Sequence, residues 1–195
     1  MTSADTQSFF PPDGWRARSF VLRSWRAGDG AALFEAVDSS RSHLRVFMPW
    51  VDKHASPEDS ERYARDACAR YLTADKCDMA VLAPDGRVLG GTGFFGHDGW
   101  LAEGMGEVGM WVRADEAGKG LASRVLAELL RWGFTDWPFL RLSWRCSGDN
   151  RASARVAEKA GMRLEGVLRS YSVDPDGTRH DIQLYGIQRH EWVAR

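Results

Sequence analysis

The sequence predicts a mixed α/β fold whose sheet is partly antiparallel. Two strand–turn–strand patterns, around Asp85-Gly86 and around residues 174–177, predict hairpins, and hairpin strands are antiparallel. Amphipathic helical segments separate other strands, which is typical of crossover connections. The chain has 195 residues, 44% of them hydrophobic, so a single domain can bury a substantial core.

The first half of the chain is expected to hold one strand, three helices and a hairpin. Residues 1–14 are expected to form a loose arm before a single domain over residues 15–195. Residues 16–25 alternate in polarity and are rich in β formers, which predicts a strand. Helices are expected at residues 28–37, at residues 39–48 before Pro49, and from a cap at Ser56 to about Thr73. The hairpin strands are expected at residues 78–84 and 87–96.

The second half is expected to alternate strands and helices and to close with a hairpin. A strand is expected at residues 106–113, followed by a helix that starts near Gly118. A further strand is expected at residues 139–146 and a helix at residues 150–160, which ends at Gly161. The closing hairpin strands are expected at residues 162–173 and 179–188.

A glycine-rich loop precedes the helix near Gly118. The free N–H groups and the dipole of a helix start favour an anion, glycine lets a phosphate approach closely, and Lys119 adds positive charge. The Walker pattern fails because Gly120 follows the lysine, and the dinucleotide pattern fails because Ser123 takes the third glycine position. The remaining interpretations are a coenzyme A pyrophosphate loop and a turn without a ligand. The residues concerned are Ala117, Gly118, Lys119, Gly120, Leu121 and Ala122.

A second motif favours the coenzyme A interpretation. From residue 146 to residue 169 the chain resembles the GNAT superfamily of acyl-CoA N-acyltransferases, most closely the RimJ/RimL-type ribosomal-protein N-acetyltransferases. Weaker likenesses extend the resemblance over roughly residues 16–192, and Met110 and Met162 stand where the family usually has aromatic residues. The matching residues are Asn150, Ser153, Glu158, Lys159, Gly161, Glu165 and Gly166.

The resemblance implies a twisted, mostly antiparallel sheet whose fourth and fifth strands splay apart around an acyl-CoA arm. The loop of residues 117–122 would hold the pyrophosphate of acetyl-CoA or of another acyl-CoA. Asn150 would bind the pantetheine arm or the acyl region, and Ser153 would lie beside it. Met110 and Val112 would face the acyl arm, with the Met110 N–H as the oxyanion donor.

Acyl transfer to an amine needs a group that takes the amine proton and a group that protonates the leaving thiolate. Glu107 is the expected base, directly or through water, although a salt bridge is an equally good interpretation of a glutamate at a strand end. Ser153 is the expected acid, because Ala157 stands where many family members carry a tyrosine. Cys146 is expected to line the site, since an acyl-cysteine would need a lowered thiol pKa.

The acceptor is expected to be the α-amine of a protein N-terminus, as the resemblance implies, and the expected substrates are short peptides with a small first residue such as serine or alanine. Trp50, Trp100 and Tyr171, together with Trp111, are candidates for the acceptor pocket, although plain core packing explains a tryptophan equally well. A polyamine, an aminoglycoside, succinyl transfer and a non-catalytic acyl-CoA sensor remain alternatives.

The composition excludes several classes of protein. The formal net charge of −1 argues against direct nucleic-acid binding. Three cysteines without metal-binding spacing argue against structural zinc and a disulfide framework, and they favour a reducing, cytoplasmic location. No apolar run is long enough to span a membrane, no signal peptide is expected, and no metal cofactor is expected. A homodimer is left open as an alternative to a monomer.

Overall fold

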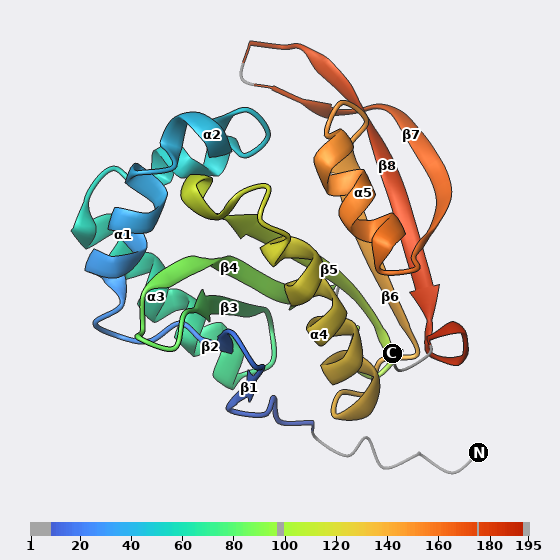
Figure 1. The fold of residues 1–195 in the computed structure, drawn as a ribbon, viewed down its shortest axis with the longest axis horizontal. Coiled ribbons are helices and arrows are strands. Elements are labelled where there is room, and N and C mark those ends of the chain that lie inside the picture. The colour runs from blue at the N-terminus through green and yellow to red at the C-terminus, as the bar shows by residue number, and fades with distance from the viewer. Residues whose placement is uncertain (1–8, 97–99, 175, 193–195) are drawn as a thin grey trace.

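The computed structural model describes residues 9–96, 100–174 and 176–192. Within them, an eight-stranded sheet has the order β1-β2-β3-β4-β5-β6-β8-β7, in which the β5–β6 pair is parallel and the other pairs are antiparallel (Figure 1). The mixed α/β prediction is therefore confirmed. The strands are β1 (Gly14–Arg16), β2 (Val21–Ser24), β3 (Cys77–Leu82), β4 (Val88–Phe95), β5 (Met105–Val112), β6 (Arg141–Ser147), β7 (Arg163–Val173) and β8 (Arg179–Gln188). The helices are α1 (Gly30–Asp38), α2 (Arg41–Arg45), α3 (Pro57–Leu72), α4 (Leu121–Thr135) and α5 (Arg151–Lys159), with 3₁₀ turns η1 (Pro49–Lys53), η2 (Ala114–Glu116) and η3 (Arg189–Glu191).

The N-terminal region differs from the sequence prediction in two ways. The strand expected at residues 16–25 is shorter, β2 at Val21–Ser24, and an additional strand, β1 at Gly14–Arg16, pairs with it, because the chain turns where the Ala17 N–H donates to the Phe20 carbonyl. From Phe9 onward, the expected loose arm packs on the domain. The Phe9 ring lies 5.1 Å from that of Trp137, and the Tyr71 hydroxyl donates to the Pro12 carbonyl. An aromatic anchor and a buried hydroxyl hold this segment in place.

The central strands are buried on both faces, which explains their nearly continuous apolar sequence. Cys77, Met79 and Val81 of β3 join the core under α4, whereas Ala80 and Leu82 join the core under α1 and α3. This alternation follows from the two-residue period of a strand. The cap of α3 is confirmed, since the Ser56 hydroxyl accepts the Asp59 N–H at 3.1 Å.

The strands β5 and β6 pair over only half of their length. The paired residues run from Met105–Arg141 to Val108–Trp144, and the pairing ends there. Beyond that point the two ribbons separate, with α4 beside β5 and α5 beside β6 (Figure 1). The fourth and fifth expected strands correspond to β5 and β6, because the structure has two strands, β1 and β2, where one was expected. The splay that the family resemblance implied between them is therefore present.

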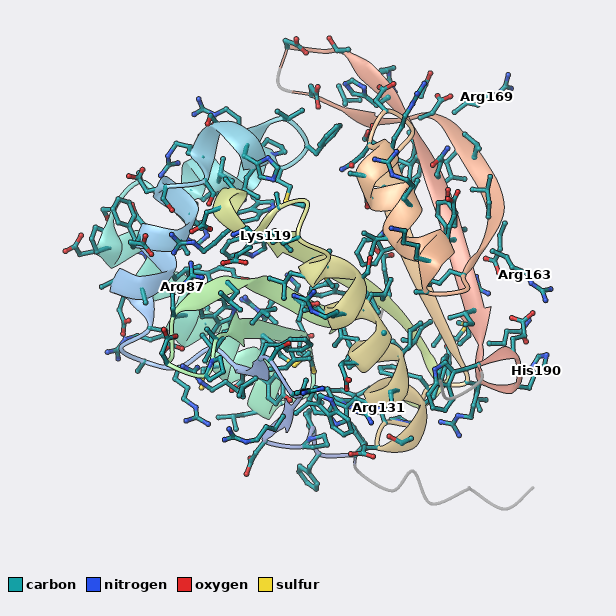
Figure 2. All side chains as sticks on the ribbon, in the orientation of Figure 1. Arg87, Lys119, Arg131, Arg163, Arg169 and His190 are labelled. Atoms are coloured by element: carbon teal, nitrogen blue, oxygen red, sulfur yellow. The ribbon has the colours of Figure 1, made fainter. Side chains whose placement is uncertain are left out.

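The C-terminal part of the sheet is covered less completely. Residues of β7 such as Leu164, Val167 and Tyr171 are exposed, and β7 forms the edge of the sheet. Figure 2 shows Arg163 and Arg169 projecting from this edge, away from the gap between β5 and β6. Among the described residues, no helix has the length and apolar character needed to cross a membrane.

Candidate active site

Two cavities approach each other where β5 and β6 separate. The gap cavity, of ≈ 310 Å³, lies between β5, β6 and the start of α5, and residues 46–49 and 172–174 lie at its sides. The aromatic cavity, of ≈ 700 Å³, lies against β4, β5, η1 and α3. Both are lined by Met48, Gly109, Met110 and Arg145. Because Val108 and Trp111 belong to opposite faces of the sheet, the cavities approach this point from opposite faces.

The backbone of β5 offers N–H groups to the gap. The Arg113 N–H donates to Leu89 of β4, so the odd-numbered N–H groups along this antiparallel strand point toward β4. The carbonyl of the odd-numbered residue Gly109 also points toward β4, since it accepts a hydrogen bond from the Thr92 hydroxyl at 2.8 Å. The N–H groups of Met110 and Val112 therefore point toward β6, which has moved away at this level.

A hydrogen-bonded set of side chains lines the opposite wall of the gap cavity. The Trp144 indole N–H donates to the Ser153 Oγ at 3.0 Å. The Ser153 hydroxyl in turn hydrogen-bonds Cys146. Burial raises the pKa of the Cys146 thiol, and this hydrogen bond opposes the rise only in part. Cys146 is therefore mainly a neutral thiol near pH 7, which disfavours it as a nucleophile.

Asn150 caps α5 and lines the gap cavity at the same time. Its Oδ1 accepts the Ser153 N–H at 3.0 Å, which positions Ser153 one turn into the helix. Because the side-chain oxygen is used in the cap, the two amide N–H donors of Asn150 remain available to a ligand in the cavity. The structure thus brings Asn150, Ser153, Cys146 and Met110, four of the expected site residues, together around one cavity.

The glycine-rich loop lies immediately before α4. Both Gly118 (φ 74°) and Gly120 (φ 76°) adopt the left-handed conformation, which explains why glycine occupies these positions. The helix itself begins at Leu121, three residues later than expected, and its first N–H groups are free of intrahelical partners. Lys119 is exposed beside this end of α4 (Figure 2). Ala117 follows η2 at the start of the loop, and Leu121 and Ala122 belong to the first turn of α4.

Ion pairs hold the turn before this loop. Arg87 of the β3–β4 hairpin contacts Asp115 at 3.1 Å and Glu116 at 2.5 Å. The buried Arg113 contacts Asp115 at 3.1 Å and Glu35 of α1 at 2.5 Å. A loop that is held in one conformation loses less entropy when it binds an anion.

Aromatic rings form the floor of the second cavity, and they lie over glycines. A Cβ atom added to Gly91 would come within 2.3 Å of the Trp111 ring, and one added to Gly109 within 2.5 Å of the Phe95 ring. Without those glycines the rings could not lie against the strands. The Trp50 ring packs 5.9 Å from that of Trp111, so Trp50 lines this cavity as expected.

Several expected site residues line neither cavity: Val112 and the loop of residues 117–122, and also Glu107, Tyr171 and Trp100. Glu107 forms an ion pair with Arg145 at 2.6 Å, which is the alternative interpretation considered from sequence. Tyr171 is exposed and hydrogen-bonds Arg145 rather than lining a cavity. Trp100 is 5% exposed and packs against Phe139 in the core, so the structure gives no support for a role at the acceptor site.

Sequence reasoning missed the residues that join the two cavities. Arg145 and Met48 are separated by almost 100 positions, and no local pattern relates them. It also missed His54, whose ring lies between Trp50 and Tyr63 and hydrogen-bonds Ser60 at 2.9 Å. The sequence did contain a signal for Phe95 and Trp111. Gly91, Gly93 and Gly109 lie on one face of β4 and β5, where they leave room for large rings.

The family model described as an acetyltransferase (GNAT) domain matches residues 19–163. The Bacillus subtilis (strain 168) protein named Putative ribosomal N-acetyltransferase YdaF is 27% identical over 173 residues, which is 88% of this chain and 92% of that protein. The Uncharacterized N-acetyltransferase YoaA of the same strain is 33% identical over 81 residues. The matched segment covers 42% of this chain and 45% of YoaA.

Solved structures share the fold. The microcin C7 self-immunity acetyltransferase MccE, solved with acetyl-CoA and AMP, superposes with a TM-score of 0.83 at 19% identity and covers 92% of this chain and 98% of its own. RimL, described as a ribosomal L7/L12 α-N-protein acetyltransferase and solved with coenzyme A in a disulfide with one of its cysteines, gives 0.80 at 19% identity and covers 88% and 95%. The chain belongs to the acetyltransferase (GNAT) family and is an N-acetyltransferase.

Proposed function

We propose that this enzyme acetylates the α-amine of a protein or peptide N-terminus by direct attack on acetyl-CoA. The observation that carries the proposal is the meeting of the two cavities at Gly109 and Met110. A thioester that enters through the gap cavity and an amine that enters through the aromatic cavity reach the same stretch of β5 from opposite faces. Positioning of this kind supplies much of the rate in a reaction between two bound substrates.

The donor side of the mechanism uses the gap cavity. The loop of residues 117–122 binds the pyrophosphate through its N–H groups, and the donors of Asn150 hold the pantetheine arm. The Met110 N–H stabilises the oxyanion of the tetrahedral intermediate. The Ser153 hydroxyl, whose oxygen already accepts the Trp144 indole N–H, gives its proton to the coenzyme A thiolate as the carbon–sulfur bond breaks.

The acceptor side needs a neutral amine. An α-amine, with a pKa of about 7.7–8.0, is about one third neutral near pH 7.5, whereas a lysine amine with a pKa of about 10.4 is neutral in about one molecule in a thousand. An α-amine therefore reacts without a strong base beside it. Glu107, held by Arg145 at the junction, receives the remaining proton through water.

The charges around the aromatic cavity argue against a polyamine or an aminoglycoside. Asp59 is paired with Arg62 at 2.8 Å, and Asp78 with Lys76 at 3.2 Å. Among the described lining residues, Asp66 is then the carboxylate without an ion-pair partner. Lys53, also among these described residues, is a lining cation that lacks an ion-pair partner too. Several ammonium groups would need several unpaired acids.

The test is acetyl transfer to matched peptides. One peptide carries a free α-amine and a blocked lysine, and its partner carries a blocked α-amine and a free lysine. We expect release of coenzyme A and an acetyl group on the first peptide only, located by mass spectrometry. Reaction of spermidine or an aminoglycoside alone would overturn the acceptor, and a preference for succinyl-CoA would overturn the acetyl donor. Tight acetyl-CoA binding without any transfer would favour the sensor alternative.

A further inference from the structure

We infer that the acceptor amine carries a large aromatic group, and that the aromatic cavity holds this group while the amine reaches Met110. The inference rests on the proposed function, because it names the class of substrate for the same site. For a peptide acceptor, the group is the side chain of the first residue.

The size of the cavity is the first argument. Its volume of ≈ 700 Å³ is more than twice that of the gap cavity. Ligand pockets typically bury most of the surface of their ligand. The methyl group of alanine or the hydroxymethyl group of serine would leave this cavity almost empty, whereas an indole or phenyl ring would contact its floor and walls.

The construction of the cavity is the second argument. Gly91 and Gly109 permit the rings of Trp111 and Phe95 to lie against the sheet, and both rings line the cavity. Trp50 closes the cavity from η1 at a tilt of 59° to Trp111. Tilted and offset pairs of rings are the arrangements that aromatic groups prefer, so a third ring gains more here than an aliphatic chain of similar area.

The charge state of the cavity is the third argument. In each of the ion pairs Asp59–Arg62 and Asp78–Lys76, the two opposite charges neutralise each other. Burial and the neighbouring Arg41 lower the pKa of His54, while Asp59 opposes this, so the ring beside Trp50 is mainly neutral near pH 7. Lys76 lies 4.8 Å from the centre of the Phe95 ring, where it contacts the aromatic face. Apart from Asp66 and Lys53, whose charges are opposite, the charged lining residues are ion-paired, which favours an uncharged, polarisable group over a charged side chain.

The tautomer of His54 provides a polar contact that fits such a group. Ser60 is fully buried, and its hydroxyl has the His54 Nδ1 as its hydrogen-bond partner in the described part of the chain. If the hydroxyl donates to Nδ1, the proton of the neutral ring lies on Nε2. The Nε2–H of His54 can then donate a hydrogen bond to a carbonyl group of the acceptor substrate or to the face of its aromatic ring.

The test compares peptides that differ only in their first residue, with acetyl-CoA saturating. We expect kcat/KM for tryptophan or phenylalanine in the first position to exceed that for alanine or serine by about 10- to 100-fold, because the ring is buried on binding. In Trp50→Ala this ratio should fall toward one, because the tryptophan and phenylalanine peptides lose the ring against which their first side chain packs. Phe47→Ala is the matched control, since Phe47 lies in the same segment but lines only the gap cavity, and it should keep the ratio.

A binding measurement separates failure of this inference from failure of the proposed function. In the coenzyme A complex, N-acetyltryptophanamide should bind at least about tenfold more tightly than N-acetylalaninamide by calorimetry, whether or not a given peptide is turned over. Equal affinities, or equal kcat/KM values for alanine and tryptophan peptides, would overturn the aromatic acceptor and leave N-terminal acetylation standing. Reaction of phenylethylamine without reaction of any peptide would overturn the peptide acceptor and support the aromatic cavity.

Discussion

The gap cavity and the aromatic cavity meet at one stretch of β5, but they are built by opposite means. The gap cavity presents backbone N–H groups and a few hydrogen-bonded side chains, such as Asn150 and Ser153. The aromatic cavity presents rings that lie over glycines, and the charges of Asp59 and Asp78 in its lining are neutralised by ion pairs. On the proposed function, this difference means that the acyl donor would be recognised mainly through backbone N–H groups. The acceptor would be recognised mainly through side chains, which could change without disturbing the donor site.

The largest effect should come from breaking the backbone part of the donor site. Gly120→Glu puts a side chain on a left-handed residue, at a cost of about 1–2 kcal/mol, and places a negative charge beside the pyrophosphate. We expect acetyl-CoA binding to become undetectable by calorimetry in a protein that remains folded by circular dichroism. Gly120→Asn is the control, since asparagine tolerates this conformation, and it should retain measurable binding. Unchanged affinity of the Gly120→Glu variant would remove the loop from the donor site.

The next effect tests the side-chain part of the donor site. Ser153→Ala should lower kcat by between about 10- and 10⁴-fold, because the leaving thiolate loses its proton donor. The affinity for acetyl-CoA should change little. Alanine keeps the cap of α5, which uses the Ser153 N–H rather than the hydroxyl. A variant with the original kcat would leave Ser153 as a wall residue.

Breaking the acceptor side should leave the donor side intact. Gly91→Ala would force the Trp111 ring to move, because the new Cβ would lie 2.3 Å from its indole nitrogen. We expect the KM for the acceptor to rise by about tenfold, the equivalent of about 1.4 kcal/mol of lost binding. The dissociation constant of acetyl-CoA should stay the same. Equal losses for both substrates would show that the two cavities are not independent.

A smaller effect sharpens the role of Trp144. Trp144→Phe removes the indole N–H that donates to Ser153 and keeps an aromatic ring in the core. A single hydrogen bond contributes about 0.5–1.5 kcal/mol, so kcat should fall by about 2- to 10-fold. In the Ser153→Ala background the same change should have almost no further effect on kcat. Additive losses in the double variant would contradict a positioning role for Trp144.

The smallest effect concerns the edge of the gap cavity. Hydrogen bonds to Asp174, and then to Asp149, raise the pKa of His180 above its usual value of 6.5. A raised pKa in the folded state means that this contact stabilises the hairpin fully below about pH 6.5 and is lost as the pH rises through the folded pKa. We expect the amide protection of residues 170–174 and 176–180 to decrease over that range in hydrogen exchange corrected for intrinsic rates. His180→Gln should remove this pH dependence, and an unchanged dependence in that variant would assign it to another group.

Local sequence patterns predicted most of the elements correctly. The Ser56 cap predicted the start of α3, Gly161 predicted the end of α5, and the turn at Asp85-Gly86 predicted the β3–β4 hairpin. These signals succeed because caps and turns depend on residues within a few positions of one another. The additional strand β1 and the turn before β2 were missed, since a turn of ordinary residues between β formers carries no glycine or proline signal.

By itself the sequence determined the family, the glycine loop and the group formed by Asn150, Ser153 and Cys146, because each of these is a short segment with its own spacing. Only the tertiary structure decided which side chains the two substrates would meet. It pairs Glu107 with Arg145, buries Trp100 in the core, and brings Met48 and Trp50 against β5 across the sheet. The physical reason is that such contacts join segments far apart in the chain. Beyond Val108 the strands β5 and β6 separate and leave the gap cavity between them.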